Sequence, residues 1–166
     1  MHPAALDEDE LLADCQLRRQ RRSGPGGQHR NKVETAVVIR HIPTGVEAAA
    51  SERRSQEENR RVAVSRLRQR LALRVRTGLD PSGFPSKLWR SRCAGGKIVV
   101  SPQHSDFPAI LAEALDVLAA RNANIAEASE FLSCTRSQLT KLLKVEPDAL
   151  RQVNQQRRAA GLPPLR

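Results

Sequence analysis

Residues 51–76 place the strongest constraint on the fold, because they combine a helical apolar pattern with a dense run of arginines. Val64, Leu67, Leu71 and Val75 recur at intervals of three or four, which places them on one face of a helix. We predict a single long helix over this range, capped by Ser51. An open sheet with the helix laid across it is the most economical way to bury such a stripe.

The strands for this sheet are expected on the N-terminal side of the helix. Residues 14–21 alternate apolar and polar side chains and predict an edge strand, and residues 36–42 are rich in β-branched side chains and predict a second strand. Residues 43–45 carry a Pro-Thr-Gly turn signal. Residues 46–50 then form the returning strand of a hairpin.

Residues 105–166 predict an all-α module. The expected helix starts are Ser105 with Pro108 in the first turn, Asn124 with Glu127, Thr135 with Gln138, and Pro147, and Gly161 ends the last helix. The second and third helices have helix-turn-helix spacing, with Ser133 where glycine is more usual. Arg136, Gln138, Lys141 and Lys144 are expected on the third helix.

Only 2% of the residues are aromatic whereas 39% are hydrophobic, so the core must be built from Leu, Val, Ile and Ala. The predicted fold class is α+β: a small sheet with one long packed helix, followed by the all-α module. We expect a flexible lead over residues 1–11, a first domain over 12–77, a linker with a short strand at 97–101 over 78–104, and the module over 105–166.

The positive charge is concentrated in one part of the chain. The net charge is +10, but residues 15–76 carry sixteen Lys or Arg against five acids, whereas residues 1–14 carry five acids and no base. A basic block of this density points to nucleic acid or another polyanion as the partner. The alternative is a merely solvated basic helix face.

Other classes of function are disfavoured by what the sequence lacks. The scattered cysteines Cys15, Cys93 and Cys134 suggest reduced thiols in the cytoplasm, and no Cys or His pair has the spacing of a zinc site. The acidic start argues against a secretory or transit signal, and no apolar run has membrane-spanning length. We expect a cytoplasmic monomer with no metal and no membrane association. The Walker spacing is absent, so no nucleotide cofactor is expected.

The segment Ser23-Gly24-Pro25-Gly26-Gly27-Gln28 lies inside the basic block. Gly26 and Gly27 have backbone freedom that residues with a Cβ lack, and Pro25 fixes its own φ. Such a loop suits a narrow polar pocket in which main chain lies against a partner.

These residues resemble the signature loop of the class I peptide chain release factor family. The resemblance begins with Arg22-Ser23-Gly24-Pro25-Gly26-Gly27-Gln28-His29-Arg30-Asn31-Lys32 and continues, in family order, through Ala36-Val37, His41-Ile42-Pro43-Thr44-Gly45, Arg54-Ser55-Gln56 and Asn59-Arg60. It covers about residues 14–76. A lone Gly-Gly-Gln is a weak signal, but several matched blocks in order are highly specific.

The resemblance implies that Gly26, Gly27 and Gln28 enter the peptidyl transferase centre of the ribosome and promote hydrolysis of the peptidyl-tRNA ester. The partners implied are ribosomal RNA and peptidyl-tRNA, and no protein general base is needed. His29 is interpreted as an RNA contact rather than a base. The residues expected to contact RNA are Arg22, His29, Arg30, Asn31, Lys32, Arg54, Arg60, Arg61 and Arg68.

Only 25 residues precede Gly26, which leaves no room there for a stop-codon-reading domain. We therefore expect a short, codon-independent relative similar to ribosome rescue factors. The alternative is a non-catalytic nucleic-acid-binding protein that uses the helix-turn-helix-like module. For that module, a plain helical bundle or a surface for ribosomal RNA or protein is favoured over DNA reading.

Overall fold

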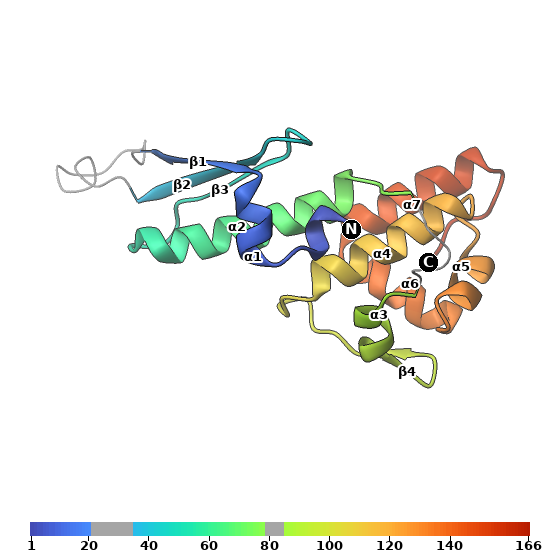
Figure 1. The fold of residues 1–166 in the computed structure, drawn as a ribbon. Coiled ribbons are helices and arrows are strands. Elements are labelled where there is room, and N and C mark those ends of the chain that lie inside the picture. Colours follow the sequence, from blue (N-terminus) through green and yellow to red (C-terminus); the bar gives the residue numbers. More distant parts are fainter. Residues whose placement is uncertain (21–34, 79–84) are drawn as a thin grey trace.

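The computed structural model describes residues 1–20, 35–78 and 85–166. Its fold is mixed, with a small antiparallel sheet and several helices (Figure 1). The sheet lies along one half of the long helix α2, and the C-terminal helices gather around its other half. The predicted α+β class is confirmed at this level.

The sheet comprises β1 (Cys15–Gln20), β2 (Ala36–His41) and β3 (Glu47–Ala50), in that order and antiparallel throughout. All three strands lie within the ranges predicted for them. Leu17 pairs with Ile39, and Ile39 pairs with Ala48, so the inward-facing side chains form one row across the sheet. The central strand β2 is mostly buried, whereas β1 is an exposed edge.

Helix α2 (Gln56–Arg74) buries its apolar stripe against β2 and β3, as predicted. The helix begins later than expected. Ser55, not Ser51, is the N-cap, and its hydroxyl accepts a hydrogen bond from the N–H of Glu58. The Ser55-x-x-Glu58 spacing is that of a capping box, which outcompetes Ser51 as a helix start.

Residues 1–11 are not the flexible lead that we expected. They contain a 3₁₀ turn, η1 (Pro3–Ala5), and part of helix α1 (Glu8–Ala13), which is capped by Asp7. Ala4 and Leu11 are completely buried in the core. Burial of these two apolar side chains therefore holds the segment in place.

The C-terminal part contains α4 (Phe107–Ala120), α5 (Ile125–Phe131), α6 (Arg136–Val145) and α7 (Pro147–Ala159). Asn124 and Thr135 cap α5 and α6 as predicted, and Pro147 opens α7. Ser105 does not cap α4, because the helix begins at Phe107 after Asp106, which makes no side-chain cap bond.

The expected linker is more structured than predicted. It contains α3 (Lys87–Arg92) and a hairpin of two-residue strands, β4 (Cys93–Ala94) and β5 (Lys97–Ile98). The buried Trp89 indole donates to the carbonyl of Leu132 at 2.7 Å, and the Arg92 guanidinium pairs with Asp106 at 2.6 Å. These contacts fasten α3 to the C-terminal helices.

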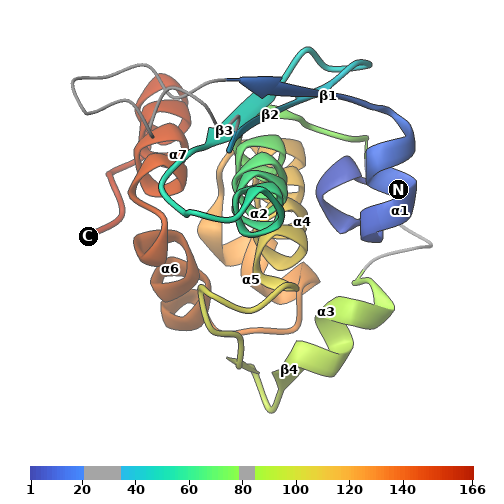
Figure 2. The same cartoon turned by 90° about the vertical axis from the view of Figure 1, so that its left-hand side faces the viewer.

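A single hydrophobic core runs through the described residues. Helix α4 packs against α2, along the part of α2 that the sheet does not cover, and the end-on view shows α6 and α7 on one flank and α1 on the other (Figure 2). The same cluster contains Leu67 and Leu71 from α2 and Ile110 and Leu111 from α4. The domain division near residue 78 stays a prediction, and this shared core crosses it.

Candidate functional site

The predicted catalytic residues Gly26, Gly27 and Gln28 lie outside the described residues, and so do Arg22, His29, Arg30, Asn31 and Lys32. The structure describes the two ends of this segment. Gln20 ends β1, and it pairs with Ala36, which begins β2. The segment therefore leaves and re-enters the protein at adjacent strands, at one end of the sheet.

Asn59 connects the re-entry point to helix α2. Its side chain is completely buried, and its Nδ2 donates to the carbonyl of Thr35 at 2.7 Å and to that of Arg53 at 3.0 Å. Its Oδ1 accepts from the N–H of Arg53 at 2.9 Å. Two carbonyls and one N–H around the amide determine which way it faces. One buried side chain thus joins Thr35, the turn at Arg53 and α2.

The predicted RNA contacts Arg54, Arg60 and Arg61 lie at or near the start of α2. Arg54 is exposed and makes no ion pair among the described residues. Arg60 pairs with Glu8 at 2.9 Å, and both Arg60 and Arg61 pair with Glu57 at 3.4 and 3.3 Å. Exposed ion pairs contribute little to stability, so these two guanidinium groups remain able to exchange partners.

Arg68 is in a different environment. It is half-buried, and its Nη2 donates to the carbonyl of Leu6 in the N-terminal segment. Arg70 and Arg76 likewise donate to main-chain carbonyls, of Glu47 and of Ala72, and Arg66 pairs with Glu52. Several arginines that read as one basic helix face are therefore engaged within the protein.

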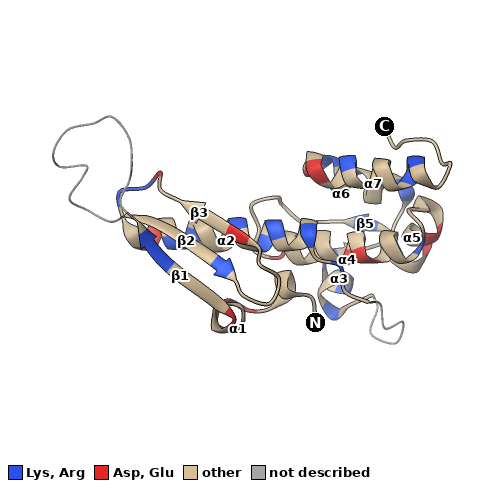
Figure 3. Cartoon of the chain, turned by 90° about the horizontal axis from the view of Figure 1, so that it is seen from above, with Lys and Arg blue, Asp and Glu red and all other residues tan. Residues whose placement is uncertain are grey.

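The structure adds basic residues that the sequence argument missed. Arg18 and Arg40 lie on the outer face of the sheet, on the adjacent strands β1 and β2, and Arg19 lies on the edge strand (Figure 3). All three are exposed. The alternating pattern of residues 15–20 and 36–41 could have predicted this. Successive side chains of a strand point to opposite faces, so Arg18 and Arg40 face outward when the apolar residues face the helix.

The block at residues 41–45 that is part of the family resemblance includes the turn between β2 and β3, at the opposite end of the sheet from Thr35. His41 is buried, and its Nδ1 lies 2.7 Å from the Thr44 hydroxyl. Burial lowers the pKa of His41, and Asp14 opposes this only in part. Gly45 has φ of +70°, which favours glycine. This block shapes the hairpin.

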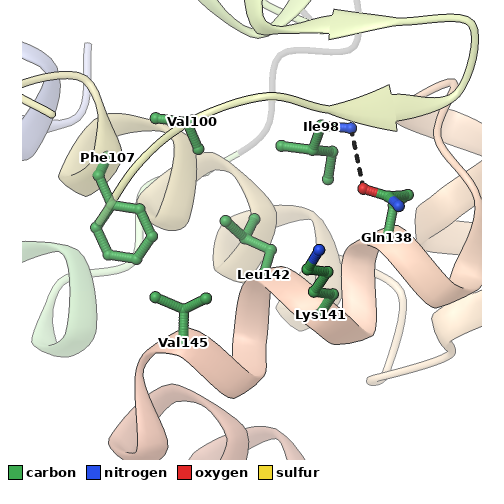
Figure 4. A pocket seen from close by; sticks show the side chains of 7 residues that line it. All are labelled: Ile98, Val100, Phe107, Gln138, Lys141, Leu142 and Val145. Atoms are coloured by element: carbon green, nitrogen blue, oxygen red, sulfur yellow. Dashed lines mark hydrogen bonds between the residues drawn. The ribbon is translucent and has the colours of Figure 1, made fainter. Parts of the chain in front are cut away.

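The α5–α6 pair has the predicted turn, in which Ser133 takes a left-handed φ of +53°. The start of α6 is covered by the β4–β5 hairpin, since the N–H of Thr135 donates to the carbonyl of Gly96 at 3.0 Å. Gln138 Oε1 accepts from the N–H of Ile98, beside an open cavity of about 110 Å³ (Figure 4). In DNA-reading helix-turn-helix proteins, this end of the second helix contacts the bases.

Within the described ranges, no cluster of three or more His, Cys, Asp or Glu side chains is arranged to hold a metal ion. In the same ranges, no helix combines the length and apolarity needed to span a bilayer.

Comparison with known proteins gives a match to the RF-1 domain over residues 8–79. Peptide chain release factor 1 of Ureaplasma parvum is 59% identical over 71 residues, which are 42% of this chain and 20% of that protein. Release factor 1 of Malacoplasma penetrans is 49% identical over 69 residues, 40% of this chain and 19% of that protein. Release factor 2 of Paramagnetospirillum magneticum is 49% identical over 59 residues, 36% and 16% respectively.

The chain spans about a fifth of the length of these curated relatives. The matched segment begins at the start of α1 and ends just beyond α2, so it includes the sheet, its long helix and the predicted catalytic loop. Residues 8–79 therefore match the RF-1 domain and are similar to the corresponding part of the class I peptide chain release factors.

Proposed function

We propose that this protein promotes hydrolysis of the peptidyl-tRNA ester on stalled ribosomes, without recognising a stop codon. The observation that carries the proposal is the RF-1 domain match, which includes the Gly26-Gly27-Gln28 sequence. Residues 21–34 connect the adjacent strands β1 and β2, and this sheet is packed on α2.

The chemistry suits the residues. Hydrolysis of an ester requires a positioned water and a donor for the developing negative charge on oxygen. The main-chain N–H of Gln28 provides a donor that does not titrate, and the Gln28 amide orients the water. Gly26 and Gly27 allow the main chain to approach the ester closely inside a pocket walled by RNA. This route needs no protein general base.

Binding to ribosomal RNA is proposed to use arginines near the two ends of the loop segment, all of them exposed except the half-buried Arg60. These are Arg54, Arg60 and Arg61 at or near the start of α2, together with Arg18, Arg19 and Arg40 on the sheet. Arg68 is left out because its guanidinium is engaged with Leu6. Contacts of this kind release counterions from the phosphates, so binding should weaken steeply with salt.

The test is peptide release from ribosomes that carry peptidyl-tRNA and an mRNA truncated at the P site. Wild type should release the peptide, and Gly27→Ala and Gln28→Ala should not. Gln155→Ala, an exposed position on α7, is the matched control and should behave as wild type. If wild type and Gln28→Ala release the peptide at equal rates, the proposal is wrong.

The codon-independent part is tested separately with ribosomes that present a stop codon, a sense codon or no codon in the A site. We expect the rate of release to be insensitive to which codon is present, stop or sense. A rate that rises only with a stop codon would restrict the proposal to ordinary termination.

The alternative, DNA reading by the α5–α6 pair, is weakened by the hairpin over the start of α6. Thr135 and Gln138, which would face the bases, are bonded to Gly96 and Ile98. The DNA-reading alternative would be supported if the full chain bound duplex DNA at physiological salt and preferred one sequence over others.

A further inference from the structure

We propose that Asn59 is a positioning residue for peptide release, because it holds the end of the loop to helix α2. The inference rests on the proposed function. It concerns the side chain that bonds to Thr35, the first described residue after the predicted catalytic segment. Asn59 does not touch the ester; it determines where the loop joins the rigid part of the protein.

The position of Thr35 explains why this bond matters. The described pairing between β1 and β2 ends at Gln20 and Ala36, and Thr35 lies just before β2. Among the described residues, the side chain that bonds the Thr35 carbonyl is that of Asn59. The Asn59 amide extends the fixed region one residue further toward Gln28. Reactive geometry is sensitive to such anchoring, since a displacement of about 1 Å can cost on the order of 100-fold in rate.

Burial makes the anchor stiff. Asn59 is 0% exposed, and its two donors and its acceptor all have partners in the protein. If the buried amide moved away from Thr35, a donor would be left unpaired in the protein interior, which is unfavourable. The same amide bonds to both the N–H and the carbonyl of Arg53. The turn before α2 and the loop end therefore keep one fixed relative position.

The decisive variant is Asn59→Asp in the full chain. Aspartate has the same shape and keeps an acceptor for the N–H of Arg53, but it cannot donate to the carbonyls of Thr35 and Arg53. We expect the maximal rate of peptide release at saturating protein to fall on the order of 10- to 100-fold. The protein concentration that gives half-maximal rate should stay within about two-fold, because the ribosome-binding arginines are unchanged.

A matched control separates positioning from loss of stability. Leu71→Ala removes a completely buried side chain from the same helix, about 18 Å from Asn59 along its axis, and destabilises the fold without touching the loop end. Both variants are assayed at a temperature at which circular dichroism shows them fully folded. The inference requires that Leu71→Ala keep the maximal rate of wild type and that Asn59→Asp lose it.

If Asn59→Asp does not fold, Asn59→Ser decides the question, because the shorter serine side chain lacks the amide group that bonds the Thr35 carbonyl and adds no charge. A folded Asn59 variant that releases peptide as fast as wild type overturns the inference while leaving the proposed function intact. If Gln28→Ala also matches wild type, the proposed function itself fails, and the inference fails with it.

Discussion

The backbone N–H of Thr135 donates a hydrogen bond of 3.0 Å to the carbonyl of Gly96, which places the tip of the β4–β5 hairpin against the first turn of α6. Thr135 also caps that helix through its side chain, which accepts from the N–H of Gln138. The hairpin and the helix start are thus joined at one residue.

This contact predicts that Gly96→Ala destabilises the protein more than Gly95→Ala. Both glycines have positive φ, +75° and +57°, so alanine at either position costs about 1–2 kcal/mol. Only at Gly96 would the new Cβ crowd a neighbour, Thr135 Cγ2 at 3.3 Å; at Gly95 it would meet nothing within 4 Å. Urea denaturation of the two variants measures the difference. Equal losses would contradict the packing described here.

Arg54 and Arg68 should separate binding from stability. Arg54→Ala should weaken ribosome binding and reduce the slope of log affinity against log salt by about 1, with stability unchanged within about 0.5 kcal/mol. Arg68→Ala should leave that slope unchanged but lower the free energy of unfolding by roughly 1–2 kcal/mol, because it removes the bond to Leu6 and the packed stem. Binding measured at several KCl concentrations, with urea titrations alongside, checks both. The reverse pattern would place Arg68 at the RNA surface.

Cys134 should be the least reactive of the thiols in the folded protein. Burial, with a smaller contribution from Cys93, raises the pKa of Cys134 to about 12, against an ordinary value of 9.0. The thiolate is the reactive form, so alkylation by iodoacetamide at pH 8 should be far slower than in urea. The raised pKa stabilises the fold below about pH 9, and this contribution is lost between about pH 9 and pH 12. Mass spectrometry of the labelled peptides compares the labelling rates of the three cysteines. Rapid labelling of Cys134 in the native protein would contradict the prediction.

Stability should fall as the pH is lowered from about 7 toward 5, because two buried histidines resist protonation. Burial lowers the pKa of His2 and of His41 below 6.5. His2 Nδ1 accepts from the N–H of Ala4, a bond that a proton on that nitrogen would break. Below pH 6.5 the unfolded chain therefore takes up more protons than the folded one, so stability decreases as pH falls.

The slope of this loss is at most about 1.4 kcal/mol per pH unit for each proton. Urea midpoints between pH 7.5 and pH 5 measure it, and the variants His2→Gln and His41→Gln should each show a shallower dependence. If both variants show the same dependence of stability on pH as wild type, groups other than these histidines cause it.

Local patterns predicted the main elements correctly. The β-branched run of β2, the spacing of Val64, Leu67 and Leu71, and the caps at Asn124 and Thr135 depend on neighbouring residues in the chain, and all are present. The family resemblance likewise depends on linear order, and the RF-1 domain match confirms it. The catalytic roles of Gly26, Gly27 and Gln28 stay a prediction.

The errors arose where distant contacts decide the outcome. Residues 1–11 were expected to be a flexible lead, because nothing in that segment itself shows that Leu11 enters the core. Arg68 and Arg54 are the same residue type in the same basic run, yet one is bonded to Leu6 and the other is exposed. A guanidinium binds whatever acceptor is close, and closeness between residues 6 and 68 exists only after folding.

The linear sequence by itself therefore determined the element types, most of their limits and the resemblance that the RF-1 domain match confirms. The reason is that periodicity, capping and motif order are properties of neighbouring residues. Only the tertiary structure decided which arginines are exposed, that the hairpin covers the start of α6, and that Asn59 reaches Thr35. The physical reason is that each of these depends on a hydrogen bond or buried contact between residues far apart in the chain, which the packed core brings together.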